Sequence, residues 1–164
     1  MQDHTWLQLA KAHNEILEIP QPATLISDNG VSIVWVGADN FIYKQSIPFL
    51  TENELYFLKR LHPLGVVPCA ERYDKITIKM ENLGFSEQIT NIDKFIETKE
   101  YIKNILDFVR HGDLTKPHVI VKNNSPFIID WAESRLKDDP RPDKRPEGDN
   151  YWIERTWKEI CEQQ

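Results

Sequence analysis

The stretch 108-FVRHGDLTKPHVIV-121 and the stretch 127-FIIDWAESR-135 place two acidic residues next to apolar, β-prone runs. Asp113 follows a His-Gly pair directly, and Asp130 ends the second run. The runs HVIV and FIID flank Lys-Asn-Asn-Ser-Pro, which predicts a compact hairpin. Two carboxylates placed in this way are candidates for catalysis, for metal binding or for a structural role in a turn. The surrounding elements decide among these roles.

Composition excludes several classes of protein. The chain has 164 residues, with 20 basic and 26 acidic side chains and a net charge of −6. Non-specific nucleic-acid binding needs clustered Lys and Arg, so we do not expect it. No apolar run approaches the roughly 20 residues that span a bilayer, and the polar start MQDHTW predicts no signal peptide. Cys69 and Cys161 fit no metal spacing and no disulfide framework, so we expect a cytoplasmic, reduced protein.

Helical and β-type patterns alternate in the first half of the chain. Apolar residues recur at helical spacing over 3–18, which predicts an amphipathic helix that ends before the prolines at 20 and 22. Three β-prone runs joined by hairpin-type turn residues then predict an antiparallel meander. These runs are 23-ATLIS-27, 31-VSIVWVG-37 and 41-FIYKQS-46.

A second helix and a fourth strand follow the meander. Thr51 with Glu54 matches a capping box, which predicts a helix from Thr51 to about His62-Pro63. Its buried face would carry Leu55, Leu58 and Leu61. The run 76-ITIKM-80 alternates and predicts a strand.

The second half of the chain is mainly helical apart from the hairpin. Residues 85–110 have a helical pattern whose buried stripe is expected at Ile102, Ile105, Leu106 and Val109. Residues 136–150 contain three prolines and few apolar groups, which predicts an exposed loop. A last helix is expected over roughly 150–162.

The order of these elements and motifs resembles the protein-kinase-like superfamily. HGDLTKPH is similar to the catalytic-loop pattern H-G-D-x-x-x-x-N of its atypical members, and IDW stands where protein kinases carry Asp-Phe-Gly. Aminoglycoside and choline kinases have the same feature. Three further stretches are similar to those of RIO kinases and of the kinase subunit of the KEOPS tRNA-modification complex. They are 54-ELYFLKRLHPLGVVP-68 (the helix of the paired glutamate), 78-IKMENLG-84 (the inter-lobe hinge) and 149-DNYWIERTW-157 (the terminal helix).

The resemblance implies an α+β, protein kinase-like fold with an antiparallel-sheet small lobe and a truncated helical large lobe. We divide the chain into an N-terminal helix (1–22), the small lobe with the hinge (23–84), and a reduced large lobe with the catalytic loop and terminal helix (85–164). Only residues 131–164 follow Asp130 in this sequence. Small-molecule kinases use a large helical region there, so we expect a protein hydroxyl or water as the acceptor.

The resemblance also implies roles for individual side chains in binding ATP and Mg²⁺. Asp113 would be the catalytic residue, which accepts or orients the proton of the attacking hydroxyl. Lys44 would hold the phosphates and Glu54 would orient it. Asp130 would bind the metal, because Mg²⁺ prefers carboxylate and phosphate oxygens. The remaining cofactor-binding residues would be Gly30 in the phosphate turn and Met80, Glu81 and Leu83 in the hinge.

Two positions depart from the family pattern. His118 stands where the family has a metal-binding asparagine, and imidazole suits Mn²⁺ or Zn²⁺ better than Mg²⁺. His118 would therefore shift the metal preference to Mn²⁺, donate a hydrogen bond to phosphate, or mark an inactive enzyme. The phosphate turn SDNGVS has Gly30 as its only glycine.

Several interpretations stay open from the sequence. The first is an ATP-dependent phosphotransferase or ATPase, such as a serine/threonine kinase, with a protein partner or substrate. The second is a pseudokinase that serves as a binding module, and the third is a small-molecule kinase completed by oligomerisation. A zinc hydrolase site of His111, Asp113, His118 and Asp130 lacks the spacing of known zinc motifs. Structural roles compete too: Glu54 as a capping residue, Lys44 as a solvated lysine, and His111 as a packing residue under the loop.

Overall fold

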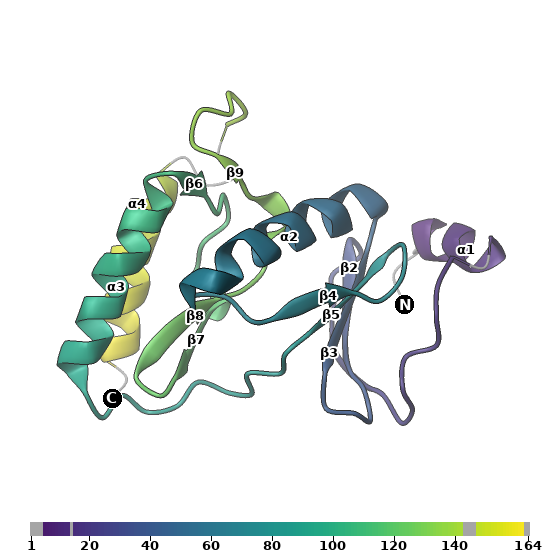
Figure 1. Cartoon of the computed structure of the whole chain (residues 1–164), viewed down its shortest axis with the longest axis horizontal. Helices are drawn as coiled ribbons and strands as arrows, with labels where there is room; N and C mark the ends of the chain where they lie inside the picture. Colours follow the sequence, from purple (N-terminus) through teal and green to yellow (C-terminus); the bar gives the residue numbers. More distant parts are fainter. Residues whose placement is uncertain (1–4, 14, 143–146, 163–164) are drawn as a thin grey trace. The chain divides into compact units, whose positions relative to one another are not determined.

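The computed structural model describes residues 5–13, 15–142 and 147–162, and the chain divides into two compact units (Figure 1). The first unit comprises Met1–Pro63 and Pro68–Asn82, and the second comprises Leu64–Val67 and Leu83–Gln164. Both units combine helices with antiparallel strands. No helix in these ranges is both long enough and apolar enough to cross a bilayer.

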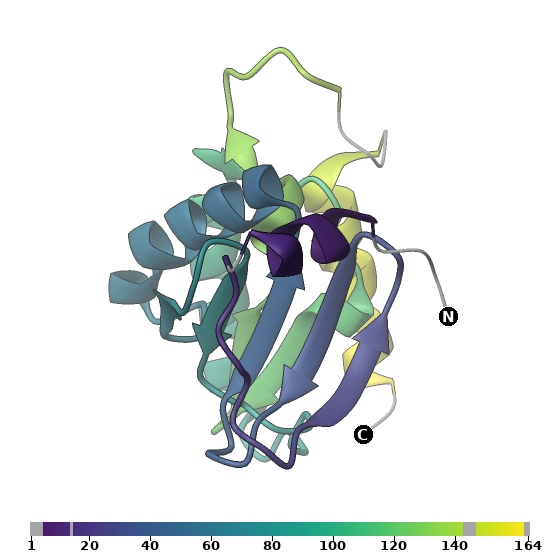
Figure 2. The same cartoon turned by 90° about the vertical axis from the view of Figure 1, so that its right-hand side faces the viewer.

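The first unit is built on a five-stranded antiparallel sheet with the strand order β1-β2-β3-β5-β4 (Figure 2). Its strands are β1 (Thr24–Asp28), β2 (Ser32–Val36), β3 (Ile42–Ser46), β4 (Ala70–Arg72) and β5 (Thr77–Met80). The predicted meander and the strand at 76–80 are confirmed. β4 was not predicted, because its three residues show no alternation of apolar and polar side chains.

Helix α2 (Pro48–Leu61) packs its leucines inward, as predicted: Leu55, Leu58 and Leu61 are all buried. The predicted start at Thr51 is wrong, because the helix begins three residues earlier at Pro48, a position that tolerates proline. Thr51 is therefore no capping residue. Its hydroxyl lies 2.9 Å from Ser46 Oγ and 3.1 Å from the Ile76 carbonyl oxygen, both inside the unit.

Helix α1 (Thr5–Ala12) is shorter than the predicted helix over 3–18, of which positions 3, 4 and 14 lie outside the described residues. Residues 15–19 are not helical, and the backbone groups of Leu17 and Glu18 bond to side chains of the β4–β5 hairpin instead. The Leu17 N–H donates to Asp74 Oδ2 at 2.9 Å, and the Tyr73 hydroxyl donates to the Glu18 carbonyl at 2.6 Å.

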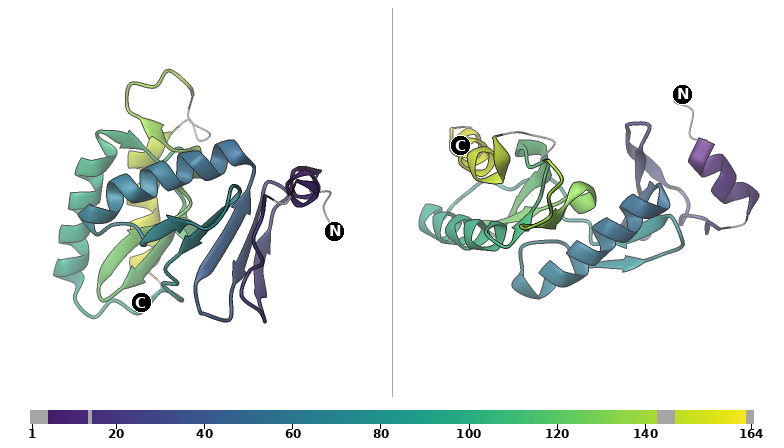
Figure 3. Two further views of the ribbon diagram at one scale, coloured as in Figure 1. Left: turned by 45° about the vertical axis from the view of Figure 1, so that its right-hand side comes forward. Right: turned by 90° about the horizontal axis from the view of Figure 1, so that it is seen from above.

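The second unit packs α3 (Ile92–Leu106) beside α4 (Gly148–Cys161), with the rings of Phe95 and Trp157 stacked at 5.5 Å (Figure 3). The predicted last helix is confirmed. β7 (Val119–Lys122) and β8 (Ser125–Ile128) form a hairpin, and β6 (Val109–Arg110) pairs with β9 (Arg135–Leu136). Short 3-10 turns are η1 (His62–Leu64), η2 (Lys116–His118) and η3 (Trp131–Glu133).

The predicted helix over 85–110 is wrong in its first turns. Residues 86–87 instead bond to β7: the Glu87 N–H donates to the Val121 carbonyl at 2.8 Å, and the Val121 N–H donates to Ser86 Oγ at 3.1 Å. The helix begins after Asn91, whose side chain accepts from the Lys94 N–H. The stripe expected to be buried is confirmed on α3 at Ile102, Ile105 and Leu106. Val109 is also buried, but it lies in β6, because the helix ends at Leu106 and not at 110 as predicted.

The predicted hairpin is confirmed, but its strands lie at other positions than the predicted 118–121 and 127–130. Asn123 and Asn124 adopt positive φ angles of 52° and 60° and make a two-residue turn, so the strands extend further toward the turn. Asp130 consequently lies beyond β8 rather than at the end of a strand. Of the predicted loop over 136–150, residues 143–146 lie outside the described residues, Leu136 belongs to β9, and 148–150 begin α4.

Candidate active site

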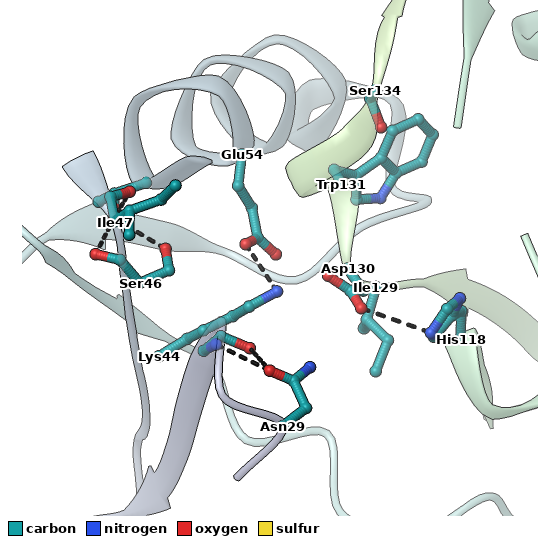
Figure 4. Close-up of polar contacts among 12 residues, drawn as sticks. Asn29, Lys44, Ser46, Ile47, Glu54, His118, Ile129, Asp130, Trp131 and Ser134 are labelled. Atoms are coloured by element: carbon teal, nitrogen blue, oxygen red, sulfur yellow. Dashed lines mark hydrogen bonds and ion pairs between the residues drawn. The ribbon is translucent and has the colours of Figure 1, made fainter. Parts of the chain in front are cut away.

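Lys44 and Glu54 form a buried ion pair in the first unit (Figure 4). Lys44 lies at the centre of β3 and Glu54 on α2, with 2.8 Å between Nζ and Oε2. The two residues are 6% and 1% exposed. The structure thus brings together the two residues that the sequence paired. Glu52, the other acid of this helix, pairs with Arg72 on the surface at 2.6 Å.

The turn between β1 and β2 holds Gly30 with a positive φ of 82°, where glycine is favoured. Side chains of the turn accept hydrogen bonds from its backbone N–H groups. The Gly30 N–H donates to Asp28 Oδ1 at 3.1 Å, while the N–H groups of Val31 and Ser32 donate to Asn29 Oδ1 at 3.0 and 2.8 Å. A phosphate that used these amides would have to displace both side chains.

The three residues predicted for the hinge fall in different units. Met80 ends β5 and Glu81 donates its N–H to the Cys69 carbonyl at 2.9 Å, both in the first unit. Leu83 belongs to the second unit, where its carbonyl accepts from Lys122 Nζ at 3.4 Å.

The loop that carries Asp113 is held by Asp149 at the start of α4. The Asp149 carboxylate accepts from the His111 N–H at 2.5 Å and from the Gly112 N–H at 3.1 Å. Gly112 has a φ of 84°, and a Cβ there would lie 2.9 Å from the Glu133 carbonyl oxygen. Glycine is therefore required at 112, and the next residue, Asp113, is placed by a rigid turn.

His111 is completely buried beneath this loop, in the packing role predicted for it. Its Nε2 donates to the Ile129 carbonyl at 2.9 Å, and its Nδ1 accepts from the Asp113 N–H at 3.3 Å. These two bonds fix a neutral tautomer. Burial away from water lowers the pKa of His111 to about 4, because the charged ring would lose its hydration.

His118 and Asp130 lie together in the second unit (Figure 4). His118 Nδ1 donates to the Asp113 carbonyl at 2.7 Å, so in the neutral ring the lone pair belongs to Nε2. That atom lies 3.4 Å from Asp130 Oδ2. The ring also stacks on His111, with 5.6 Å between the centroids.

Asp130 takes a left-handed conformation, with φ 66° and ψ 58°, just before η3. Its neighbour Trp131 is 1% exposed and donates its indole N–H to the Ile128 carbonyl at 2.9 Å. The Ser134 hydroxyl donates to the His111 carbonyl at 3.1 Å, which ties the end of η3 to the loop of Asp113. The backbone on both sides of Asp130 is thus fixed by buried contacts.

The donor set of the second unit fits a divalent cation that is shared with phosphate. Two ligands at about 2.1 Å from a metal and at right angles are about 3.0 Å apart, close to the 3.4 Å between His118 Nε2 and Asp130 Oδ2. Among the described residues, no group of three or more His, Cys, Asp and Glu side chains could hold a metal. Mg²⁺ in phosphate-binding sites needs only one or two carboxylates, because phosphate and water complete its shell.

Two contributors to the site have no clear sign in the sequence. Asp149 lies 36 residues beyond Asp113; the sequence marks it as the first residue of the terminal-helix motif 149-DNYWIERTW-157, but nothing in the sequence shows that it contacts the loop of Asp113. Asn29 accepts hydrogen bonds from amides of its turn. The sequence indicates this only through Asp-Asn-Gly, because Asp and Asn side chains typically bond to the backbone of their own turn.

Comparison with known proteins identifies the fold. No family model matches the chain, and no curated protein matches its sequence. The Rio2 kinase from Chaetomium thermophilum, in a complex with ADP, Mg²⁺ and phosphoaspartate, matches with a TM-score of 0.57 and 15% identity over 94% of this chain. The streptomycin–ATP ternary complex of APH(2″)-IIa matches with a TM-score of 0.51 and 12% identity, over 83% of this chain and 73% of that one. This chain spans 57% of the Rio2 kinase chain. The expected α+β, protein-kinase-like fold is thereby confirmed.

Replacing Asp149 with Asn should loosen the loop of Asp113. The amide keeps the size of the side chain, but it loses the charge and turns an NH₂ group toward one of the two backbone N–H donors. We expect the free energy of unfolding to fall by about 1.5–3 kcal/mol and the amides of His111 and Gly112 to exchange faster with solvent. The control is Asp138→Asn, the same change at an exposed position. Equal exchange rates in the two variants would contradict the role of Asp149.

The buried, neutral His111 should make stability depend on pH. Its folded pKa of about 4 lies below the unfolded value of 6.5, so its contribution is complete above pH 6.5 and is lost as pH falls through about 4. Between pH 7 and pH 5 this loss should amount to about 2 kcal/mol. Urea unfolding of the wild type and of His111→Gln at both pH values isolates it. Identical pH slopes in the two proteins would rule out His111 as the source.

Proposed function

We propose that this protein is an ATP-dependent phosphotransferase or ATPase, and the buried Lys44–Glu54 pair carries the proposal. A charged pair inside a protein loses more hydration than it gains in attraction unless its geometry is good, so it contributes little to stability. A lysine oriented by a buried carboxylate is instead suited to hold phosphate oxygens in place. The fold shared with the Rio2 and APH(2″)-IIa chains supports this interpretation.

The second unit would supply the chemistry. Asp113 would accept or orient the proton of the attacking hydroxyl, on a loop that Gly112 and Asp149 hold in one conformation. Asp130 would bind Mg²⁺ jointly with phosphate oxygens. Bound Mg²⁺ neutralises the negative charge of the phosphates during transfer. Met80, Glu81 and Leu83 would contact the adenine and Gly30 the phosphates.

His118 would make this metal site unusual. Its Nδ1–H is committed to the Asp113 carbonyl, so the neutral ring offers Nε2 as an acceptor toward the side of Asp130. A neutral imidazole in this tautomer can ligate a metal but cannot donate from Nε2 to a phosphate. Since imidazole suits Mn²⁺ better than Mg²⁺, we propose that the site prefers Mn²⁺.

The phosphate acceptor would be a serine or threonine hydroxyl of a protein, or water. Exposed apolar side chains in the second unit support a protein partner; Phe85 is 97% and Phe108 is 75% exposed. A reducing, cytoplasmic location is consistent with the two exposed free cysteines, Cys69 and Cys161.

A pseudokinase is the second candidate, and the β1–β2 turn favours it. The amides of Gly30, Val31 and Ser32 all bond to side chains of the turn itself. A binding module with no turnover would need no free amides at this turn.

Replacing Asp113 with Asn separates these two functions. If Asp113 is the catalytic residue, ATP turnover should fall by about 10²–10⁴-fold, while the rise in the unfolding midpoint with ATP and metal should remain. Asp138→Asn serves again as the control and should turn over ATP like the wild type. A wild type that is stabilised by ATP but has no turnover with any protein or water acceptor would instead indicate the pseudokinase.

Replacing His118 with Asn tests the metal ligand directly. With Mn²⁺ and ATP bound, the wild type should show a nitrogen hyperfine coupling from imidazole in pulsed electron paramagnetic resonance, and His118→Asn should lose it. The variant should also shift its preference from Mn²⁺ toward Mg²⁺ in thermal unfolding. His62→Asn, at an exposed histidine, is the matched control. A wild-type spectrum without nitrogen coupling would exclude His118 as a ligand.

A further inference from the structure

The turn between β1 and β2 is closed against anions by its own side chains. Besides its two amide bonds, Asn29 Oδ1 lies 3.3 Å from the Ser32 hydroxyl, which donates to it. Asp28 places a carboxylate oxygen 3.1 Å from the Gly30 amide nitrogen, where a phosphate oxygen would otherwise bind. A phosphate must therefore displace one neutral and one negatively charged acceptor before it meets a backbone N–H group.

The N-terminal helix contacts this same turn. The Trp6 indole N–H donates to the Gly30 carbonyl at 3.3 Å, and Figure 2 shows α1 beside the end of the sheet where the turn lies. Ala10 is 4% exposed, so the helix packs against the unit rather than extending into solvent. The conformation of Gly30 is thus held from one side by Asp28 and from the other by Trp6.

The segment after α1 ties the helix to the opposite edge of the sheet. Glu15 forms an ion pair with Lys75, the Leu17 N–H bonds to Asp74, and the Glu18 carbonyl accepts from Tyr73, all at the β4–β5 turn. The Ala38 N–H also donates to the Pro20 carbonyl at 2.9 Å. This anchoring keeps α1 at a high effective concentration near the β1–β2 turn, even when the Trp6 contact opens.

We propose that α1 is an autoinhibitory latch, which holds the β1–β2 turn in a form that excludes the phosphates of ATP. The latch opens when Trp6 leaves Gly30, because the turn can then reorganise and exchange the Asp28 and Asn29 oxygens for phosphate oxygens. This inference rests on the proposed function, since it assigns the turn to phosphate binding. It makes the N-terminal segment the regulator of nucleotide affinity.

The test compares Trp6→Phe with the wild type by two independent measurements. Phenylalanine keeps an aromatic ring on α1 but removes the indole N–H donor. Calorimetric titration with ATP and Mn²⁺ or Mg²⁺ should show tighter binding, by a factor on the order of five for one hydrogen bond. Without nucleotide, the amides of Gly30, Val31 and Ser32 should exchange faster. Trp152→Phe is the matched control, because the Trp152 indole donates to Glu147 at 3.4 Å in the other unit.

Asn29→Ala is the second variant, which frees two amides without touching α1. It should also bind ATP more tightly than the wild type does. Unchanged exchange in Trp6→Phe overturns the latch, whatever the titrations show. Wild-type binding of ATP that neither variant strengthens overturns the latch but leaves the phosphotransferase proposal intact. Absence of ATP binding in the wild type and in both variants overturns both proposals.

Discussion

The first unit is organised around a charged pair that is almost completely buried. Lys44 projects from the central residue of β3 and Glu54 from the second turn of α2, so their contact fixes how the helix lies on the sheet. Either charge alone in this interior would be strongly destabilising, because the opposite charge replaces much of the lost hydration. The Thr51 hydroxyl, one turn before Glu54, bonds to backbone oxygens at the same interface. Polar contacts thus add direction to the packing of α2, whose apolar face is buried through Leu55, Leu58 and Leu61.

The second unit follows the same principle with backbone groups instead of charges. His111 is neutral, and each of its ring nitrogens contacts the main chain, one at Ile129 and the other at Asp113. The Asp113 carbonyl in turn selects the tautomer of His118, and so decides which nitrogen points toward Asp130. The chemistry available at His118 thus depends on the buried backbone geometry around His111. A mutation that distorts this loop would move the His118 ring without replacing that residue.

The sequence predicts those features that repeat along the chain or follow a known motif. The leucine face of α2, the apolar stripe of α3 and the β1–β3 meander all come from periodic burial. The pairing of Lys44 with Glu54 was predicted from the order of the motifs. Prediction failed where long-range hydrogen bonds decide the structure. Residues 86–87 bond to Val121 instead of forming a helix, and Leu17 and Glu18 bond to the β4–β5 turn. Asp149 accepts hydrogen bonds from amides 37 and 38 residues before it. The prediction of a capping box at Thr51 was wrong, because the Thr51 hydroxyl bonds to buried carbonyl oxygens and the helix begins earlier, at Pro48.

The distribution of charge constrains how a nucleotide would bind. The β1–β2 turn carries the anionic Asp28, the second unit carries Asp113 and Asp130, and the whole chain has a net charge of −6. The carboxylates of Asp113 and Asp130 would repel a free triphosphate. A divalent cation reverses the sign of the interaction, because it is attracted by the carboxylates and by the phosphates alike. Under the proposed function, nucleotide affinity would depend mainly on the metal, and the β1–β2 turn would serve as a point of control.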